Sequence, residues 1–499
     1  MARISVNNLT FSYDDYYDNI FEDVSFAIDS NWKLGFVARN GRGKSTFLNL
    51  LMGKYEYSGT IQSDLEFLYF PIGIPEEKYS HNVIDLMEEV FPDVEFWRVC
   101  MELNLLEMDA ELLYRPFQTL SYGERTRVML AYLFAGEHKF LLLDEPTNHL
   151  DVECREKIKE YLAKKEGFIL VSHDRDILDA CIDHVLVINK TNIEVVKGNF
   201  STWYENKERQ DQFEKDKNES LKKDIGRLTT AARQARTWAD KVESAKIGYD
   251  PKKDSHRCID TRAYMGEKSR RMQQRRKNLE GRIQKGIEEK QGLLKNVEEI
   301  VDLKLFPEEF YKRYIFTARD LEIGYNGKKV GGTLTFEIER GDRIAIVGGN
   351  GSGKSTLIKT LLGQLKPIGG ELNCSQGVRI SYVAQSASLM KGTLEEYARK
   401  YGIDYTVFLS VLRQLDFERV QFEKRMEEYS EGQKKKVEIA RSLCEKAHLY
   451  IWDEPMNYID VFSRMQIERV IETFRPTMIF VEHDKTFVEH ISTKKIVVS

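Results

Sequence analysis

Nine consecutive residues in the second half of the chain have the composition of a phosphate-binding loop. The segment 348–356 reads Gly-Gly-Asn-Gly-Ser-Gly-Lys-Ser-Thr and follows the apolar stretch 344–347. Glycines let backbone N–H groups close round phosphate oxygens, and the start of a following helix adds positive potential. A glycine turn with a purely structural role would not need the whole pattern. The nucleotide-binding residues predicted here are Gly348, Asn350, Gly351, Gly353, Lys354, Ser355 and Thr356.

The first half carries a variant of this loop at residues 38–46, which read Ala-Arg-Asn-Gly-Arg-Gly-Lys-Ser-Thr. Ala38 replaces the leading glycine, and its β-carbon would crowd the loop, so we expect altered nucleotide affinity. In both loops the lysine supplies charge to the β- and γ-phosphates and the next serine ligates Mg²⁺. The predicted binding residues of the first loop are Asn40, Gly41, Gly43, Lys44, Ser45 and Thr46.

Two apolar stretches end in an Asp-Glu pair, at residues 144–145 and 453–454. We expect Asp144 and Asp453 to join the ligands of Mg²⁺ and the glutamates, Glu145 and Glu454, to polarise the attacking water. Such pairs also cap helices, but a cap does not explain two pairs at matching distances from the two loops. His173 and His483 each follow another apolar stretch. A lone histidine is more often structural, but its recurrence favours a γ-phosphate sensor.

These motifs recur at a nearly constant offset. Lys44 and Lys354 lie 310 residues apart, and Asp144 and Asp453 lie 309 apart. Such regularity indicates an internal duplication. Short apolar stretches alternate with helical patterns in residues 1–200 and again in residues 306–499, which predicts two α/β domains.

The insert between the copies, residues 201–305, has a different composition. Apolar or small residues recur at steps of four and three, at Leu221, Ile225, Leu228, Ala232, Ala235, Ala239 and Val242. This heptad pattern predicts a long helical hairpin (coiled coil), with an irregular tip at residues 247–264.

The charge of the insert is strongly positive. Residues 222–285 carry a net charge of +11, while the whole chain carries −5. Two interpretations stay open: a surface that faces a polyanion, or a solvated charged coiled coil. Candidate phosphate contacts are Arg227, Arg233, Arg236, Arg270, Arg271, Arg275 and Arg276. Aromatic tip residues that would stack on bases, or pack the loop, are Tyr249, His256 and Tyr264.

Composition limits the alternatives. The six cysteines form no Cys-x-x-Cys pair, which argues against zinc ribbons and iron–sulfur clusters and favours a reduced, cytoplasmic setting. The first ten residues lack a signal-peptide pattern. No apolar run approaches the roughly 18 residues that a membrane helix needs. We therefore expect that the chain does not associate with a membrane, and we exclude that it is a complete membrane transporter.

Two further segments carry a family resemblance: Ser121-Tyr122-Gly123 and Ser430-Glu431-Gly432 resemble the signature motif of ATP-binding cassette (ABC) domains. The resemblance implies two head-to-tail domains that sandwich two ATP molecules within one chain, so the paired sites need no protein partner. Ser121 and Gly123 would then close over the Lys354 site, and Ser430 and Gly432 over the Lys44 site. Tyr13 and Tyr325 would stack on the adenines.

The two copies depart from this pattern in different ways. Gln385 stands at the Q-loop position, where the family places a residue of the Mg²⁺ shell, and its first-half counterpart is Ile72. The segment after Glu145 matches the family closely, whereas residues 455–460 vary. We therefore expect two unequal sites.

Fused cassettes with a charged helical linker resemble the ABC-F family, which acts on ribosomes. Residues 72–121 leave little room for the extra arm of many housekeeping members, so the chain looks most like the antibiotic-resistance subgroup (lincosamide, pleuromutilin and streptogramin A type). The resemblance implies an ATPase that enters the E site of the 70S ribosome and contacts rRNA and P-site tRNA. The linker tip would displace the drug near the peptidyl-transferase centre.

Other functions stay open at this level. The chain can be an ABC-F general translation factor without drug protection, or the ATPase subunit of a membrane transporter. Net charge also does not distinguish RNA from DNA as the partner of the hairpin.

Overall fold

The computed structural model describes most of the chain. The described ranges are 3–13, 19–39, 41–137, 139–148, 150–189, 192–247, 303–325, 327–349, 351–386, 390–417 and 419–498, with single residues or short runs between 267 and 285. The chain divides into two compact units: Met1–Trp203 together with Val301–Ser499, and Tyr204–Ile300. Asn40, Asn350 and the predicted tip after Ile247 lie outside the described residues.

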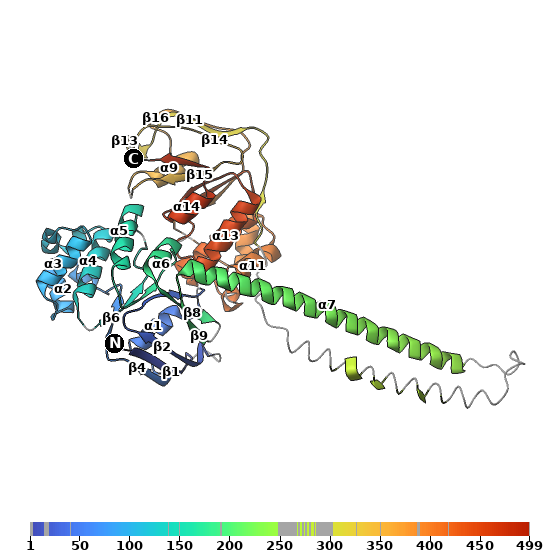
Figure 1. Cartoon of the computed structure of the whole chain (residues 1–499). Helices are drawn as coiled ribbons and strands as arrows, with labels where there is room; N and C mark the ends of the chain where they lie inside the picture. Colours follow the sequence, from blue (N-terminus) through green and yellow to red (C-terminus); the bar gives the residue numbers. More distant parts are fainter. Residues whose placement is uncertain are drawn as a thin grey trace, which may run out of the picture. The chain divides into compact units, whose positions relative to one another are not determined.

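The first copy is built on a sheet that can be followed in part in Figure 1, and the predicted motifs come after the carboxyl ends of its strands. Strand pairs are parallel except for the last two strands, which are antiparallel. Neighbouring parallel strands bring their carboxyl ends to one edge, where open α/β sheets bind ligands. In spatial order the described strands are β5 (Glu66–Phe70), β6 (Lys139–Asp144), β7 (Phe168–Val171), β3 (Lys33–Val37), β8 (His184–Asn189) and β9 (Asn192–Lys197).

The second copy repeats this arrangement with an all-parallel sheet of described strands. The order is β17 (Ile380–Val383), β19 (Leu449–Asp453), β20 (Met478–Val481), β15 (Arg343–Val347) and β21 (Lys494–Val497). The inner strands β19 and β20 are buried along their whole length, because both faces of a parallel sheet are covered. Trp452, Tyr450 and Phe480 fill this core and are at most 1% exposed. The predicted α/β architecture is confirmed for both copies.

Each copy also has a small antiparallel sheet. In the first it contains β2 (Phe21–Asp29), β1 (Arg3–Phe11) and β4 (Ser58–Gln62), and in the second β14 (Leu334–Glu339), β11 (Tyr314–Glu322) and β16 (Gly369–Cys374). Two short ribbons pair β10 (Phe306–Pro307) with β18 (Lys446–Ala447) and β12 (Gly324–Tyr325) with β13 (Lys328–Lys329).

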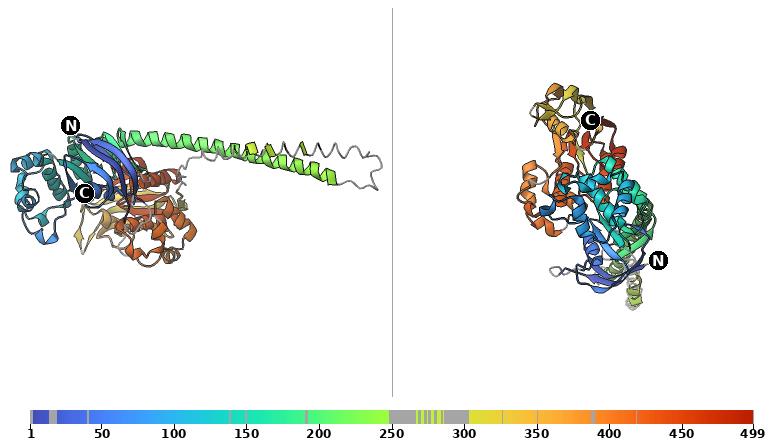
Figure 2. Two further views of the ribbon diagram at one scale, coloured as in Figure 1. Left: turned by 90° about the horizontal axis from the view of Figure 1, so that it is seen from below. Right: turned by 90° about the vertical axis from the view of Figure 1, so that its left-hand side faces the viewer.

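Matching helices occur in both copies, and their colours can be followed in Figure 2. In the first copy they are α1 (Lys44–Leu51), α2 (Val83–Val90), α3 (Phe96–Leu105), α4 (Tyr122–Ala135), α5 (Val152–Ala163) and α6 (Arg175–Cys181). In the second they are α9 (Lys354–Leu361), α10 (Leu394–Tyr401), α11 (Tyr405–Gln414), α12 (Glu431–Cys444), α13 (Val461–Phe474) and α14 (Lys485–Ile491). Short 3₁₀ turns span Glu76–Lys78, Ala110–Tyr114, Phe117–Thr119, Arg419–Glu423 and Met426–Glu428.

A single helix, α7 (Phe200–Ile247), leads out of the first copy and has 48 residues. At 1.5 Å per residue its length is about 72 Å. Leu221, Ile225 and Leu228 of the predicted heptad pattern are half-buried along it, whereas most of its charged side chains are exposed. The described residues between 267 and 285 are also helical, and Ile283 among them is 8% exposed. The helical character predicted for the insert is confirmed at these residues.

None of the helices that the structure describes has the length and apolar content needed to cross a bilayer.

The first helix turn of α13 depends on a buried ion pair. Lys436 Nζ lies 3.5 Å from Asp460 Oδ2, and the two side chains are 4% and 0% exposed. Asp460 also caps α13 by accepting the Ser463 N–H. Burial alone would raise the pKa of Asp460, but the Lys436 charge and the Ser463 N–H lower it to about 2.

We predict that Asp460→Asn lowers the free energy of unfolding by about 3–5 kcal/mol, because asparagine keeps the cap but leaves the Lys436 charge buried without its counter-ion. Since the folded-state pKa lies below the ordinary value of about 4, the stabilisation by Asp460 is complete above about pH 4 and is lost toward pH 2. Urea unfolding at several pH values measures the free energy of unfolding. Glu395→Gln in the exposed pair Arg399–Glu395 is the control, with an expected loss below about 0.5 kcal/mol. Equal losses would contradict the prediction.

Candidate nucleotide-binding sites

Both phosphate-binding loops join a central strand to a helix, β3 to α1 and β15 to α9. Gly351 and Gly353 have φ angles of 80° and 105°, in the left-handed region that favours glycine. A β-carbon on Gly348 would lie 2.2 Å from the carbonyl oxygen of Val498, so this position of the second loop excludes any side chain. In the first loop the Ala38 methyl group is buried in the core of its copy. The two loops therefore have different surroundings at their first residue.

The loop lysines point back into their own loops. Lys354 Nζ donates to the carbonyl oxygens of Gly348 and Gly349, each at 2.9 Å, and Lys44 Nζ donates to that of Ala38 at 2.8 Å. Burial lowers the pKa of both lysines, while nearby carboxylates oppose the shift. Each ammonium group is thus held inside its loop of backbone amides, where phosphate oxygens would bind.

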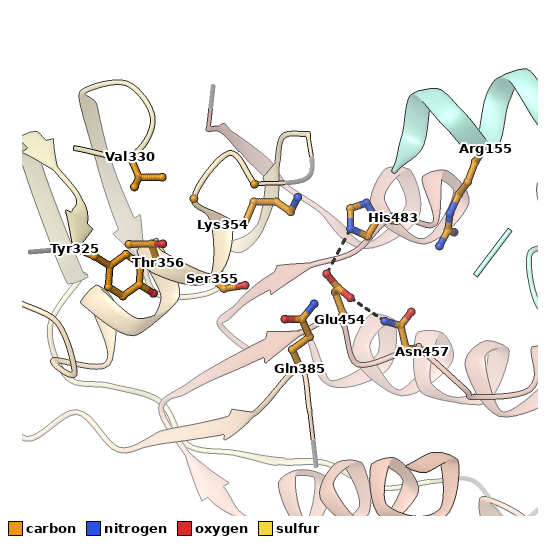
Figure 3. Close-up of a pocket in the computed structure, with 12 residues that line it drawn as sticks. Arg155, Tyr325, Val330, Lys354, Ser355, Thr356, Gln385, Glu454, Asn457 and His483 are labelled. Carbon is orange, nitrogen blue, oxygen red and sulfur yellow. Dashed lines mark hydrogen bonds and ion pairs between the residues drawn. The ribbon is translucent and has the colours of Figure 1, made fainter. Parts of the chain in front are cut away.

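A pocket of about 530 Å³ opens beside the second loop (Figure 3). This volume suits a small-molecule ligand. Its lining includes the following predicted site residues: Tyr325, Gly351, Gly353, Lys354, Ser355, Thr356, Gln385, Glu454 and His483. Asn457 and Arg155, which the sequence did not single out, line it as well, and Arg155 belongs to the first copy.

The two tyrosines predicted to stack on adenine have different surroundings. Tyr325 is 42% exposed at the pocket, with Lys359 Nζ 6.0 Å from its ring centroid. The ring is therefore accessible to a flat ligand. Tyr13 is half-buried: its hydroxyl bonds to Thr46 Oγ1 at 2.9 Å, and its ring packs edge-on against Phe11 and Tyr55.

Glu454 is surrounded by hydrogen-bond donors (Figure 3). Asn457 Nδ2 donates to Glu454 Oε2 at 2.8 Å, and His483 Nε2 lies 3.5 Å from Oε1. Burial alone would raise the pKa of Glu454, but hydrogen bonds from His483, Gln385 and Asn457 lower it to about 2. The carboxylate is therefore ionised at neutral pH and faces the pocket.

Glu145 occupies the matching position in the first copy, and its surroundings differ. His173 Nε2 lies 3.2 Å from Glu145 Oε1, yet this buried oxygen accepts no hydrogen bond from the residues that the structure describes. Burial, with the neighbouring Asp144 charge, raises the pKa of Glu145 to about 8. Burial and nearby cations lower the pKa of His173 well below its usual value, so the imidazole is neutral. The two sites are electrostatically unequal.

The residues predicted to hold Mg²⁺ fit that role in the second copy. Within the described part of the chain, Asp453 Oδ1 is buried without a hydrogen-bond partner. The Ser355 hydroxyl bonds to the same carboxyl group, and burial raises the pKa of Asp453 to about 6. A free carboxylate oxygen beside a hydroxyl suits Mg²⁺, which takes its other ligands from phosphates and water in such sites. Among the described residues there is no cluster of three or more His, Cys, Asp or Glu for an all-protein metal site.

The remaining metal-site predictions have other partners in this structure. Gln385 bonds to Glu454. In the first copy, Ser45 and Tyr69 both bond to Asp144, with the Tyr69 hydroxyl 2.8 Å from Oδ2. Ile72, the counterpart of Gln385, has no polar side-chain group to donate to Glu145.

The signature serines begin helices. Ser121 caps α4 and Ser430 caps α12, each in a capping box with the residue three positions later. A β-carbon on Gly123 would lie 2.7 Å from Cys154 Sγ, and one on Gly432 would lie 3.3 Å from Tyr458 Cβ. Both serines are exposed at the helix starts, and neither is among the described residues that line the 530 Å³ pocket.

The two copies contact each other beside the loops. Arg39 of the first loop pairs with Asp416 of the second copy, at 2.6 Å between Nη1 and Oδ1. Arg175 pairs with Glu468 across the same boundary. The sequence motifs did not point to these residues, although one signal was present: Arg39 stands where the second loop has Gly349. A charged residue replacing a loop glycine needs a partner, and the fold supplies it from the other copy.

Comparison with known proteins agrees with this geometry. The sequence profile of the ABC transporter family matches residues 21–148 and 332–457, just over half of the chain. The chain belongs to the ABC transporter family. Each matched segment contains one phosphate-binding loop, one signature motif and one Asp-Glu pair. The chain is therefore an ATPase with two ABC domains that bind ATP.

Relatives match nearly the whole chain. A ribosome protection protein of Bacillus subtilis (strain 168), VmlR, is 24% identical over 502 residues, 99% of this chain and 86% of that protein. The ATP-binding protein Uup of Buchnera aphidicola subsp. Acyrthosiphon pisum (strain APS) is 26% identical over 532 residues, 99% of this chain and 80% of that protein. The resemblance to tandem-cassette proteins of the ABC-F type is confirmed.

Solved structures share the fold. The archaeal ribosome recycling factor aABCE1, crystallised with the ribosomal stalk protein aP1, has a TM-score of 0.63 at 20% identity and is matched over 98% of this chain and 87% of that one. An RNase-L inhibitor structure has a TM-score of 0.61 at the same identity, over 98% of this chain and 87% of that one.

The unequal glutamates lead to a prediction about turnover. Glutamine at either position should slow hydrolysis at its own site about 100-fold, because the base is lost. Since donors hold Glu454 ionised while burial favours the neutral form of Glu145, we predict that Glu454→Gln removes most of the ATPase activity and Glu145→Gln less than half. Phosphate release measures both. A larger loss for Glu145→Gln than for Glu454→Gln would contradict the prediction.

The Arg39–Asp416 pair gives a second prediction. It is tested in the Glu454→Gln chain, in which the second site is inactivated and the remaining ATPase activity comes from the first site. Arg39→Asp should raise the KM for ATP about tenfold, because two carboxylates then repel each other beside the loop. Adding Asp416→Arg restores the pair and should return KM to within about twofold. No rescue in the double variant would indicate that Arg39 acts without Asp416.

Proposed function

We propose that this protein binds the 70S ribosome in its ATP-bound form, enters the E site and displaces antibiotics through the tip of its linker. Support comes from the tandem cassettes, the basic linker and the whole-length similarity to the ribosome protection protein VmlR. The ribosome recycling factor that shares the fold agrees with a ribosomal partner. A ribosomal partner implies a cytoplasmic location.

The observation that carries this proposal is the cluster at the root of α7. Trp203 is 8% exposed, and its ring lies 6.1 Å from that of Phe462 on α13 of the second copy. The Arg39 guanidinium of the first loop lies 6.0 Å from the same Phe462 ring. One aromatic side chain thus contacts both a phosphate-binding loop and the start of the linker. A movement of the two copies on binding ATP would shift this root and with it the whole helix.

Hydrolysis would then release the ribosome. In each cassette the lysine and glycines bind the phosphates, the glutamate polarises a water molecule and the histidine senses the γ-phosphate. Ser355 with Asp453, and Ser45 with Asp144, would hold Mg²⁺, which neutralises charge on the phosphates when bound. Gln385 would orient Glu454. The signature segments at Ser121 and Ser430 would complete the opposite sites when the copies close.

The described arginines of the linker suit phosphate recognition. Arg227, Arg233, Arg270 and Arg271 are exposed. Two of them make weak helical pairs, Arg227 with Asp224 at 3.8 Å and Arg271 with Glu267 at 2.6 Å, which exposed phosphates can replace. Arginine binds phosphate in a bidentate manner, and each contact adds to the salt dependence of binding. The side chain of Arg236 and the whole of Arg275 and Arg276 lie outside the described residues, as do Tyr249, His256 and Tyr264.

The test uses the Glu145→Gln/Glu454→Gln chain, which should keep ATP and stay closed. We predict that it co-sediments with 70S ribosomes in ATP but not in ADP. Arg227→Glu/Arg233→Glu should weaken retention at least about tenfold, because two phosphate contacts become repulsive. The exposed Arg399→Glu serves as the control. No ATP-dependent retention would refute the proposal.

A second candidate is a translation factor without drug protection. It is favoured by the similarity, at 26% identity, to Uup, whose name states only ATP binding. Inhibitory concentrations of a lincosamide, a pleuromutilin and streptogramin A in a susceptible host separate the two. Protection should be lost when residues 247–264 are altered, while ATPase activity stays the same. Unchanged inhibitory concentrations with the intact chain would favour the translation factor.

A further inference from the structure

The helix α3 of the first cassette is apolar on two opposite faces. Val99, Leu103 and Leu106 point into the core and are 0% exposed. Trp97, Met101 and Leu105 follow one another at steps of four on the other side and are 55%, 58% and 52% exposed. Residues four apart lie above one another on a helix, so these three form one continuous stripe. We refer to Trp97, Met101 and Leu105 as the α3 stripe.

The second cassette shows that the fold does not require this stripe. Its helix α11 matches α3 at an offset of 309 residues. The inward positions stay apolar and buried, as Phe408, Leu412 and Leu415. The positions that match the stripe are the polar residues Thr406 and Ser410, which are exposed, and Gln414, which is half-buried. The same helix in the same fold is therefore stable with polar residues on its outer face, which separates the stripe from core packing.

The segment that contains the stripe also differs in net charge from its counterpart in the second copy. Residues 76–111, which contain α2 and α3, carry eleven acidic and two basic side chains, a net of −9. The matching residues 385–420 carry five of each, a net of zero. A negatively charged surface repels the phosphates of RNA and of anionic lipids and attracts a basic surface. Figure 1 shows α2, α3 and α4 grouped together in the first cassette.

The helix is also held firmly in place. Glu102, between the stripe residues, faces the interior and accepts hydrogen bonds from the Tyr161 hydroxyl, at 2.7 Å, and from Lys165 of the α5 region. Arg98 lies 5.2 Å from the Trp97 ring. Tryptophan and methionine are among the residue types that are enriched at protein interfaces.

We propose that the α3 stripe docks a basic protein that presents an apolar patch, and that on the ribosome this partner is a ribosomal protein rather than rRNA. This inference rests on the proposed ribosomal function. The two regions then bind different components of the ribosome: the basic linker binds nucleic acid, and the acidic segment of the first cassette binds protein.

Site-specific photocrosslinking tests the kind of partner. A benzophenone amino acid replaces Met101 in the Glu145→Gln/Glu454→Gln chain on 70S ribosomes with ATP, and the matched control carries it at Ser410. We expect a protease-sensitive, RNase-resistant crosslink from position 101 to a basic protein, at least about fivefold stronger than from position 410. Crosslinking to RNA, equal yields, or no crosslink from ribosome-bound protein overturns the α3 docking proposal alone. Absence of co-sedimentation overturns the ribosomal function and this inference together.

A variant built from the chain's own second copy tests the energetic role. Trp97→Thr/Met101→Ser/Leu105→Gln gives α3 the outer face of α11, so folding and ATPase activity without ribosomes should be unchanged. Ribosome affinity should fall about tenfold. Thr406→Ala/Ser410→Ala/Gln414→Ala is the matched control and should retain full affinity. Unchanged affinity of the stripe variant, with normal thermal unfolding, contradicts the inference.

Discussion

Each phosphate-binding loop contains a lysine whose ammonium group is largely desolvated, and carboxylates of both copies oppose the resulting fall in its pKa. Lys44 is stabilised in its charged form by Asp460 of the other copy as well as by its own Glu145 and Asp144. The carboxylates of Glu454, Asp453 and, from the other copy, Asp151 raise the pKa of Lys354 against the effect of burial. An ammonium group in a low-dielectric interior needs such partners. Each loop lysine is therefore within the electrostatic influence of a carboxylate of the opposite cassette.

The duplication then makes differences between the copies informative, because the fold is the same on both sides. Gln385 and Asn457 surround Glu454 with donors, whereas Glu145 faces a neutral histidine. Arg39, in place of a loop glycine, reaches Asp416 and the Phe462 ring. The three positions of the α3 stripe are apolar, whereas the matching positions of α11 are polar. These departures from symmetry coincide with the places where function can differ: turnover, coupling to the linker and docking.

Charge is distributed unevenly along the chain. The linker is strongly basic within an acidic chain, and the α2–α3 region is strongly acidic within its cassette. Electrostatic complementarity of this kind selects partners more than it raises affinity. The Phe462 ring packs against Trp203, at the start of the linker, and lies near Arg39 of the first phosphate-binding loop. One aromatic side chain therefore lies between the nucleotide-binding loop and the linker.

The sequence by itself determined the parts that depend on local patterns. Loop glycines, apolar strands ending in acids, and the heptads of the linker follow from backbone geometry and periodicity, which residues close in sequence encode. The duplication offset made the paired sites visible as well. The sequence also predicted two unequal sites, but only the tertiary structure decided the pairing of Arg39 with Asp416, the lining of the second pocket by Arg155, and the opposite pKa shifts of Glu145 and Glu454. These depend on residues hundreds of positions apart and on burial, and no local pattern specifies either.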